Sequence, residues 1–370
     1  MRIANVLLGA SLLLWAAPVS AQEQKSHEFT MATGWAGGPL MEVGAQAFAD
    51  EVEQLSNGRI TIEVYPAGTL GPGLKVPETV QNGIADMGHT WSGYDWGIDP
   101  TAVLFGGYAG SFDTERMLHW LYRGGGVELW ADWRKEKFNL VGMPLFIRTA
   151  EVFLHSRKPV RSLEDIKGLK LRTAGAWLEM ARELGAAPVT MPGGDVYTAL
   201  ERGTIDATEW GTLWEDQAVG FHQVTKYVII PGVHQPTAPF ELVINPDSWA
   251  ELSESDQELI RTAAFNTTIN SWLSIGQNDA KALQFFKDEG NEIIELDPEV
   301  QYQAHEIGLR WAEGIAKEND WFAKVLKSQK EFVQLWAGAD RYRKVMVREE
   351  ASATAAQPAG SASDDTKPAE

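Results

Sequence analysis

The chain has 370 residues, of which 44% are apolar and 22% are charged, and its formal charge is −19. A chain of this length exceeds the roughly 250–300 residues that one hydrophobic core serves, so two lobes are expected. The acidic balance argues against nucleic acid or an anionic membrane as a partner, and the absence of cysteine excludes disulfides and thiolate metal sites.

Residues 1–21 have the pattern of a secretory signal peptide. Arg2 provides a positive start, residues 6–17 are almost wholly apolar, and small residues lead up to Ala21. The apolar stretch is shorter than the roughly 20 residues that a membrane-spanning helix needs. Export with cleavage after Ala21 is therefore favoured over a membrane anchor.

Strands and helices alternate through the first hundred residues. Residues 29–33, 60–64 and 85–88 have the composition of strands, and the apolar spacing within residues 40–55 and 75–82 predicts helices. This alternation favours an α/β layer with a largely parallel sheet.

The alternation continues up to residue 244. A long helix is expected over residues 113–137, with shorter ones at 178–184 and 195–202. Further strands or extended segments are expected at residues 140–146, 169–172, 188–190, 205–207, 227–230 and 241–244.

The pattern then changes to long helices, which we expect at residues 253–287, 299–318 and 321–347. Residues 351–370 are small and polar and contain little that a core could bury. We expect this last segment to be a disordered tail.

No short motif of enzyme chemistry is present. The chain contains no HExxH, no CxxC and no GxxxxGK[ST], and its seven histidines show no spacing typical of metal ligands. The residues by themselves therefore give no specific support to an enzyme.

One segment, residues 167–210, carries a specific family resemblance. It contains KGLKLRT at 167–173 and PGGDVYTALERGTIDATEW at 192–210. This order resembles the solute-binding subunits of tripartite ATP-independent periplasmic (TRAP) transporters, the DctP family. The chain looks closest to the branch that binds α-keto acids and related carboxylates, and the resemblance covers roughly residues 28–335.

The resemblance implies a two-lobed periplasmic-binding-protein fold of the α/β class, with one helix spanning both lobes and a C-terminal helical extension. Lobe I is expected at residues 28–147 with 236–275, and lobe II at 148–235 with 276–320. The extension would then occupy residues 321–350.

The function that the resemblance implies is capture of a small 2-oxo or hydroxy acid in the periplasm and its delivery to TRAP membrane subunits. In the family an arginine after the G-L-K strand anchors the ligand, which is Arg172 here. A planar guanidinium matches two carboxylate oxygens and keeps its charge when buried. The alternative is a surface arginine that pairs with some acid.

The resemblance also implies a cation, Na⁺ or Ca²⁺, that bridges to the ligand. Glu209 would contribute its carboxylate, and Trp210 its carbonyl and ring, because hard cations prefer oxygen ligands. The glutamine that the branch uses as a contact to both ligand and metal falls at Glu151 in this chain, which makes Glu151 a candidate for both contacts. The added negative charge requires a divalent cation or Arg148 as compensation, or a different substrate.

Five further residues are weaker site candidates. Trp35 and Tyr94 lie in loops that face the cleft in such folds, and Trp214 either lines the site or packs beside it. Gln235 and Glu241 come from the returning segment and are candidates for additional metal contacts.

Two other functions stay open from the sequence. One is a binding protein for an ATP-driven importer or a sensor, against which the block up to Trp210 argues. The other is an exported hydrolase or lyase that uses Glu209 and Glu151 as a pair of acids. No nucleophile in the chain supports this second alternative.

A homodimer through the C-terminal helices is also expected from the family. Trp311, Trp321 and Trp336 lie on helices long enough to reach a partner. The alternative is that these rings cover the core of their own chain.

Overall fold

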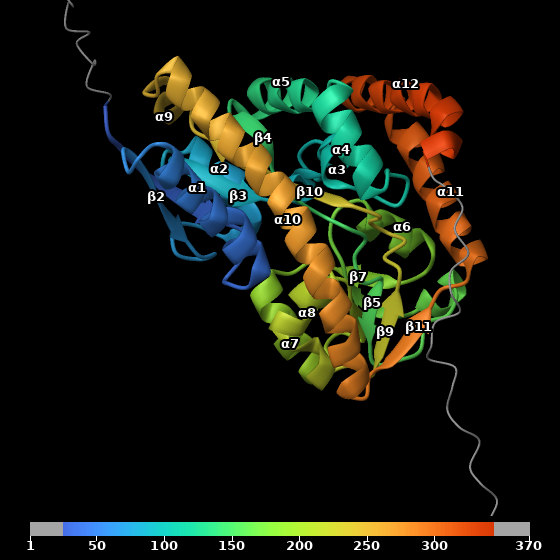
Figure 1. Cartoon of the computed structure of the whole chain (residues 1–370). Coiled ribbons are helices and arrows are strands. Elements are labelled where there is room, and N and C mark those ends of the chain that lie inside the picture. The colour runs from blue at the N-terminus through green and yellow to red at the C-terminus, as the bar shows by residue number, and fades with distance from the viewer. Residues whose placement is uncertain (1–24, 344–370) are drawn as a thin grey trace, which may run out of the picture.

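The computed structural model describes residues 25–343 (Figure 1). The signal peptide predicted at residues 1–21 and the tail predicted at 351–370 lie outside the described residues. Two β-sheets flanked by helices form two α/β lobes, so the predicted fold class is confirmed.

The sheet of the first lobe has the strand order β2-β1-β3-β10-β4. Its strands are β1 (His27–Thr33), β2 (Ile60–Tyr65), β3 (Met87–Thr90), β4 (Val141–Arg148) and β10 (Ala238–Ile244). β1 is parallel to β2 and β3, whereas β10 is antiparallel to β3 and β4. The parallel arrangement expected from the alternation therefore holds for the first three strands, and the returning strand makes the sheet mixed.

The sheet of the second lobe has the order β11-β9-β5-β8-β6-β7 and is also mixed. The sequence did not predict β5 and β11, which are short and lie outside the alternating pattern. The strands are β5 (Leu154–Ser156), β6 (Lys170–Arg172), β7 (Ala187–Val189), β8 (Ala207–Thr208), β9 (Tyr227–Ile230) and β11 (Glu292–Glu295).

The helix predicted over residues 113–137 is two helices in the structure. The chain breaks at Gly125, whose φ of 83° is in the left-handed region that glycine adopts without strain. The helices of this lobe are η1 (Met41–Gln46), α1 (Ala47–Leu55), η2 (Gly73–Lys75), α2 (Val76–Gln81), η3 (Ser92–Asp95), α3 (Ala102–Gly106), α4 (Thr114–Arg123) and α5 (Gly126–Phe138).

The helices of the second lobe are short. The sequence did not predict α8, although Thr212 and Glu215 form a capping box at its start, a recognisable N-terminal signal. These helices are η4 (Leu163–Ile166), α6 (Trp177–Glu183), α7 (Gly193–Glu201), α8 (Leu213–Val219) and η5 (Phe221–Gln223).

After α9 (Pro246–Ala250), helix α10 (Glu254–Asp288) runs for 35 residues and contacts both lobes (Figure 1). Toward the first lobe, the Ser271 hydroxyl accepts a hydrogen bond from the Ile147 amide at 3.0 Å. Toward the second, the Asp279 carboxylate accepts one from the Trp214 amide at 2.9 Å. This helix is the predicted element that spans the two lobes.

The C-terminal extension consists of α11 (Pro298–Ile315) and α12 (Asp320–Arg343). The Trp311 indole donates to Glu179 of α6, and the Trp321 indole donates to Glu136 of α5, each at 2.8 Å. The extension therefore contacts a helix of each lobe. Within residues 25–343, no helix combines the length and the apolar character needed to cross a membrane.

Candidate functional site

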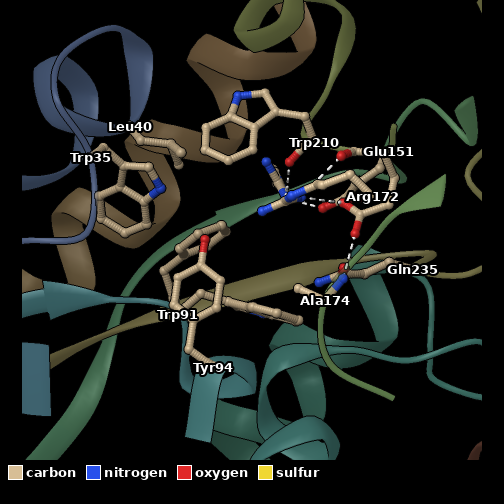
Figure 2. Close-up of a pocket in the computed structure, with 12 residues that line it drawn as sticks. Trp35, Leu40, Trp91, Tyr94, Glu151, Arg172, Ala174, Trp210 and Gln235 are labelled. Atoms are coloured by element: carbon tan, nitrogen blue, oxygen red, sulfur yellow. Dashed lines mark hydrogen bonds and ion pairs between the residues drawn. The ribbon is translucent and has the colours of Figure 1, made fainter. Parts of the chain in front are cut away.

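A small cavity lies between the two sheets (Figure 2). Charged groups line one end, and mostly aromatic rings line the other. The lining residues are Trp35, Leu40, Trp91, Tyr94, Arg148, Glu151, Arg172, Ala174, Glu209, Trp210, Gln235 and Phe240.

Strand ends bring these side chains together. Trp35 follows β1, Tyr94 follows β3, Glu209 follows β8, and Arg172 is the last residue of β6. In α/β sheets the carboxyl ends of parallel strands meet at one edge, where ligands bind. The two lobes turn these edges toward each other.

Arg172 is buried in the cavity wall, with 1% of its surface exposed. Its Nη1 donates to the backbone carbonyl and the carboxylate of Glu209 at 3.0 and 3.3 Å. Its Nε and Nη2 donate to the Met191 carbonyl at 3.4 and 3.2 Å, and the guanidinium lies 5.1 Å over the ring of Trp210. A guanidinium has five N–H groups, so these four bonds leave one Nη2 hydrogen for a ligand.

Two buried carboxylates, those of Glu209 and Glu151, line the same cavity as Arg172. Glu209 Oε1 accepts from the Ala174 amide at 2.8 Å. Glu151 accepts from Arg148 and pairs with His234 Nε2 at 2.7 Å. Burial raises the pKa of the Glu151 carboxyl, but Arg148 and His234 outweigh that effect and hold the pKa below its usual value.

Arg148 links the cavity to α8. Its guanidinium bonds to Glu151 on one side and to Glu215 on the other, and Nη2 also approaches the Trp210 carbonyl at 3.4 Å. Burial alone would lower the pKa of Arg148, but the two carboxylates raise it above its usual value. Arg148 therefore stays charged, but it compensates Glu151 only in part because it also pairs with Glu215. A divalent cation therefore stays among the possibilities that the sequence left open.

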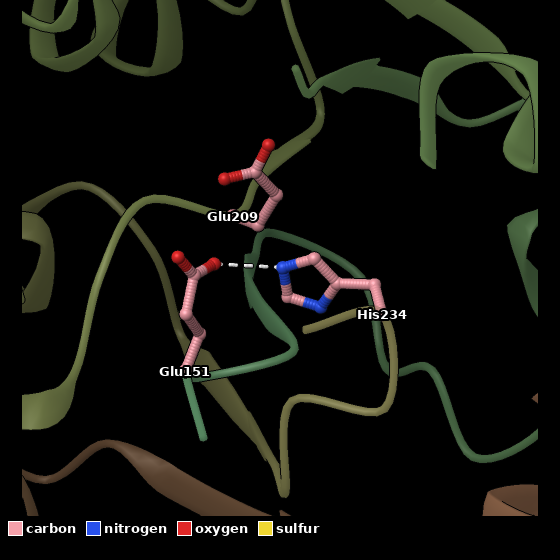
Figure 3. A group of neighbouring side chains, drawn as sticks. All are labelled: Glu151, Glu209 and His234. Atoms are coloured by element: carbon pink, nitrogen blue, oxygen red, sulfur yellow. Dashed lines mark hydrogen bonds and ion pairs between the residues drawn. The ribbon is translucent and has the colours of Figure 1, made fainter. Parts of the chain in front are cut away.

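Glu151, Glu209 and His234 could together hold a metal ion (Figure 3). Each offers one ligand atom, and these atoms lie within 4.8 Å of one another. Two carboxylates suit a hard cation, and the Trp210 carbonyl lies near the same arginine as Glu151. The donor set therefore fits the cation that the resemblance implies.

The structure disagrees with one predicted metal ligand, Glu241. Its carboxylate is fully buried and accepts hydrogen bonds from Arg134 and, at 2.9 Å, from the Trp130 indole. Both carboxylate oxygens therefore accept hydrogen bonds from side chains of α5, away from the cavity. Glu241 is thus a partner in a buried ion pair and not a ligand of this site.

Of two other candidates, Gln235 and Trp214, only Gln235 lines the cavity. Gln235 lines it, while its amide nitrogen donates to the Gly106 carbonyl at 2.9 Å. Trp214 is not among the lining residues and packs, half-buried, in the neighbouring aromatic cluster. Of the two alternatives for Trp214, the structure favours packing.

Sequence reasoning missed several residues of the site. His234 was not singled out because histidine spacing along the chain does not report proximity in space. Its position next to Gln235 in the returning segment was the available signal. The other missed residues are Leu40, Trp91, Ala174 and Phe240.

Comparison with known proteins agrees with this geometry. The profile of the family described as bacterial extracellular solute-binding protein, family 7 (DctP), matches residues 31–317. A monocarboxylate 2-oxoacid-binding periplasmic protein of a Nostoc species is 28% identical over 306 residues, which cover 82% of this chain and 83% of that protein.

Two solved structures are also similar. The first, from Bordetella bronchiseptica RB50, is a TRAP transporter solute-binding protein, a mixed-occupancy dimer with copurified calcium and picolinate. Its TM-score is 0.81 at 25% identity, with 86% of this chain and 95% of that chain covered. The second, a TRAP periplasmic solute-binding protein from Pseudoalteromonas atlantica with sodium and pyruvate, has a TM-score of 0.78 at 25% identity, with coverages of 86% and 98%.

The family profile spans most of the chain, and the two-lobed fold with a cavity between the lobes agrees with it. The resemblance inferred from residues 167–210 is therefore confirmed. This chain belongs to the bacterial extracellular solute-binding proteins of family 7, the DctP family of TRAP solute-binding proteins.

Proposed function

We propose that the protein captures a small carboxylate, a 2-oxo or hydroxy acid, together with a cation and delivers it to the membrane subunits of a TRAP transporter. The observation that carries this proposal is that Arg172 and Glu209 converge, buried, in one cavity between the lobes. Delivery to an ion-gradient-driven permease follows from membership of the family.

Arg172 would anchor the ligand carboxylate. Its guanidinium lines the cavity, and a carboxylate removed from water requires such a partner. The rings of Trp35, Trp91 and Tyr94 enclose the opposite end. They would select the shape of the ligand and exclude water from the ion pair.

The cation would bind beside the ligand, held by the carboxylates of Glu209 and Glu151 and the carbonyl of Trp210. Gln235, which lines the same cavity, would supply a further oxygen. Similar proteins hold calcium or sodium with a carboxylate. Such an ion supplies positive charge to the ligand's oxygens.

The proposed mode of capture is a hinge closure of lobe I, residues 28–147 with 236–275, on lobe II, residues 148–235 with 276–320. The predicted signal peptide and the periplasmic location of the family support action in the periplasm. A fractionation experiment tests this location: the mature chain should appear in the periplasmic extract and lack residues 1–21.

A homodimer remains part of the proposal, on the precedent of a dimeric relative. The rings of Trp311, Trp321 and Trp336 all have contacts within their own chain, so their presence alone does not require a partner. Light scattering of the purified protein should give twice the chain mass, and a single chain mass would remove the dimer.

Calorimetric titration of chelator-treated protein tests binding directly. Pyruvate and other 2-oxo and hydroxy acids should bind when Ca²⁺ or Na⁺ is added, and the ligand should be recovered unchanged afterwards. Absence of binding for all these acids with either ion would contradict the proposal, and chemical conversion of the ligand would support an enzyme instead.

A further inference from the structure

We propose that Glu151 makes the cation site of this protein select a divalent ion over a monovalent one. The inference rests on the proposed function and concerns the cation that would bind beside the carboxylate ligand. It follows from how many buried charges surround the cavity and from what neutralises each of them.

Two carboxylates face the same point in the cavity. Glu151 and Glu209 are 3% and 5% exposed, and their ligand oxygens and the His234 nitrogen lie within 4.8 Å of one another. Like charges this close repel strongly at a buried site. A cation between them removes the repulsion, and an ion of higher charge removes more of it.

The arginines near the cavity are outnumbered by the acids. Arg148 is shared between Glu151 and Glu215, and Arg172 pairs with Glu209. The three carboxylates of Glu151, Glu209 and Glu215 against the two guanidiniums of Arg148 and Arg172 leave an excess of one negative charge. A bound monocarboxylate ligand raises this excess to two negative charges.

A divalent cation neutralises this excess, whereas a sodium ion leaves one buried negative charge. Uncompensated buried charge is costly, because the low-dielectric interior replaces the water that would solvate it. The number of charged ligands is also what sets calcium affinity in protein sites. The charge count therefore favours Ca²⁺ over Na⁺.

Glu151 is held in place for this role. Arg148 binds Oε1, and His234 Nε2 lies 2.7 Å from Oε2, while the Glu151 amide donates to the Gln235 carbonyl at 3.3 Å. A carboxylate fixed by its neighbours loses little freedom when it binds an ion, which adds to affinity.

The test is the substitution Glu151→Gln, which keeps an oxygen donor and removes the charge. Ca²⁺ is titrated calorimetrically into chelator-treated protein in choline chloride, with and without saturating pyruvate. We expect the variant to bind Ca²⁺ about tenfold more weakly or worse. Pyruvate binding should depend on Ca²⁺ in the native protein but be supported by NaCl in the variant.

Two control variants separate charge from other effects. Glu215→Gln removes a carboxylate outside the metal-ligand group, and glutamine at this capping-box position still accepts from the Thr212 amide, so we expect a smaller loss of Ca²⁺ affinity. Glu151→Asp keeps the charge and should keep the preference for Ca²⁺. Melting curves confirm that each variant is folded.

Equal pyruvate binding by the native protein in NaCl and in CaCl₂ would overturn the inference, as would an unchanged Ca²⁺ affinity in Glu151→Gln. The Ca²⁺ titration without pyruvate separates the two proposals. If Ca²⁺ binds and Glu151→Gln weakens it, the inference stands even if no carboxylate binds. If a carboxylate binds and Ca²⁺ does not, only the proposed function survives.

Discussion

Among single side chains, Arg172 has the largest expected effect on binding. Replacing it with alanine would leave both the ligand carboxylate and Glu209 without their buried partner. We expect a loss of about 2–5 kcal/mol of binding free energy, measured by calorimetry. Arg172→Lys should recover only part of it, because an ammonium lacks the planar fork.

Arg182→Ala is the matched control for Arg172, since Arg182 is exposed on α6. It should bind the ligand as the native protein does. Native affinity in Arg172→Ala would remove Arg172 from the ligand site.

His89 predicts a dependence of stability on pH. Burial lowers its pKa to about 4, although the hydrogen bond from Nδ1 to the Glu241 carbonyl at 3.0 Å opposes the shift. Between this value and the unfolded value of 6.5, the unfolded chain binds a proton that the folded chain does not. Titration of His89 should therefore leave the free energy of unfolding unchanged above pH 6.5. It should lower that free energy as the pH falls from 6.5 toward 4.

Urea unfolding at several pH values measures this effect. Within that window His89 should contribute a slope of about 1.4 kcal/mol per pH unit to the free energy of unfolding. His89→Gln, whose amide can still donate to the Glu241 carbonyl, should lose that contribution. Identical slopes in the two proteins would show that His89 does not titrate as expected.

Among the elements, the start of α7 positions an aromatic wall of the cavity. A Cβ at Gly193 would overlap the Trp210 ring, whereas one at Gly194 would meet open space. We expect Gly193→Ala to displace the Trp210 ring, which changes the tryptophan fluorescence and weakens ligand binding. Both substitutions replace glycine at the same helix end, so Gly194→Ala is a close control.

Gly194→Ala should bind the ligand as the native protein does. Its stability should be equal to that of the native protein or higher by about 0.5–1 kcal/mol, because alanine favours the helix. Equal ligand affinity in the two variants would mean that the packing of Gly193 under Trp210 does not support the site.

For the whole molecule, the proposed closure involves a contact between the lobes. Gly175 follows β6 with φ 63°, and a Cβ there would lie 2.6 Å from the Trp91 ring of the other lobe. Gly175→Ala should therefore obstruct closure. We expect weaker ligand binding and a larger radius of gyration in ligand-saturated solution, measured by small-angle scattering.

Gly290→Ala separates this obstruction from backbone strain. Gly290 also has a positive φ, 84°, but a Cβ there would meet open space. This variant should lose stability and still close on the ligand. If both variants bind equally well, the contact between Trp91 and Gly175 does not limit closure.

Much of the fold follows from local patterns in the sequence. The alternation of short strands and amphipathic helices predicted β1, β2 and β9 to within two residues, because their side-chain periodicity is set by neighbouring positions alone. Three-residue strands such as β5 are too short to show a period. Their pairing partners lie far away in the chain.

The sequence by itself determined the family and the two-lobed class, because the resemblance rests on a contiguous block of residues, and that block also contains the proposed anchor Arg172. The tertiary structure alone decided which side chains meet. On β10, Phe240 lines the cavity while Glu241 pairs with Arg134 behind it, since successive residues of a strand face opposite sides. His234 likewise joined Glu151 only through folding, as 83 positions separate them in the chain.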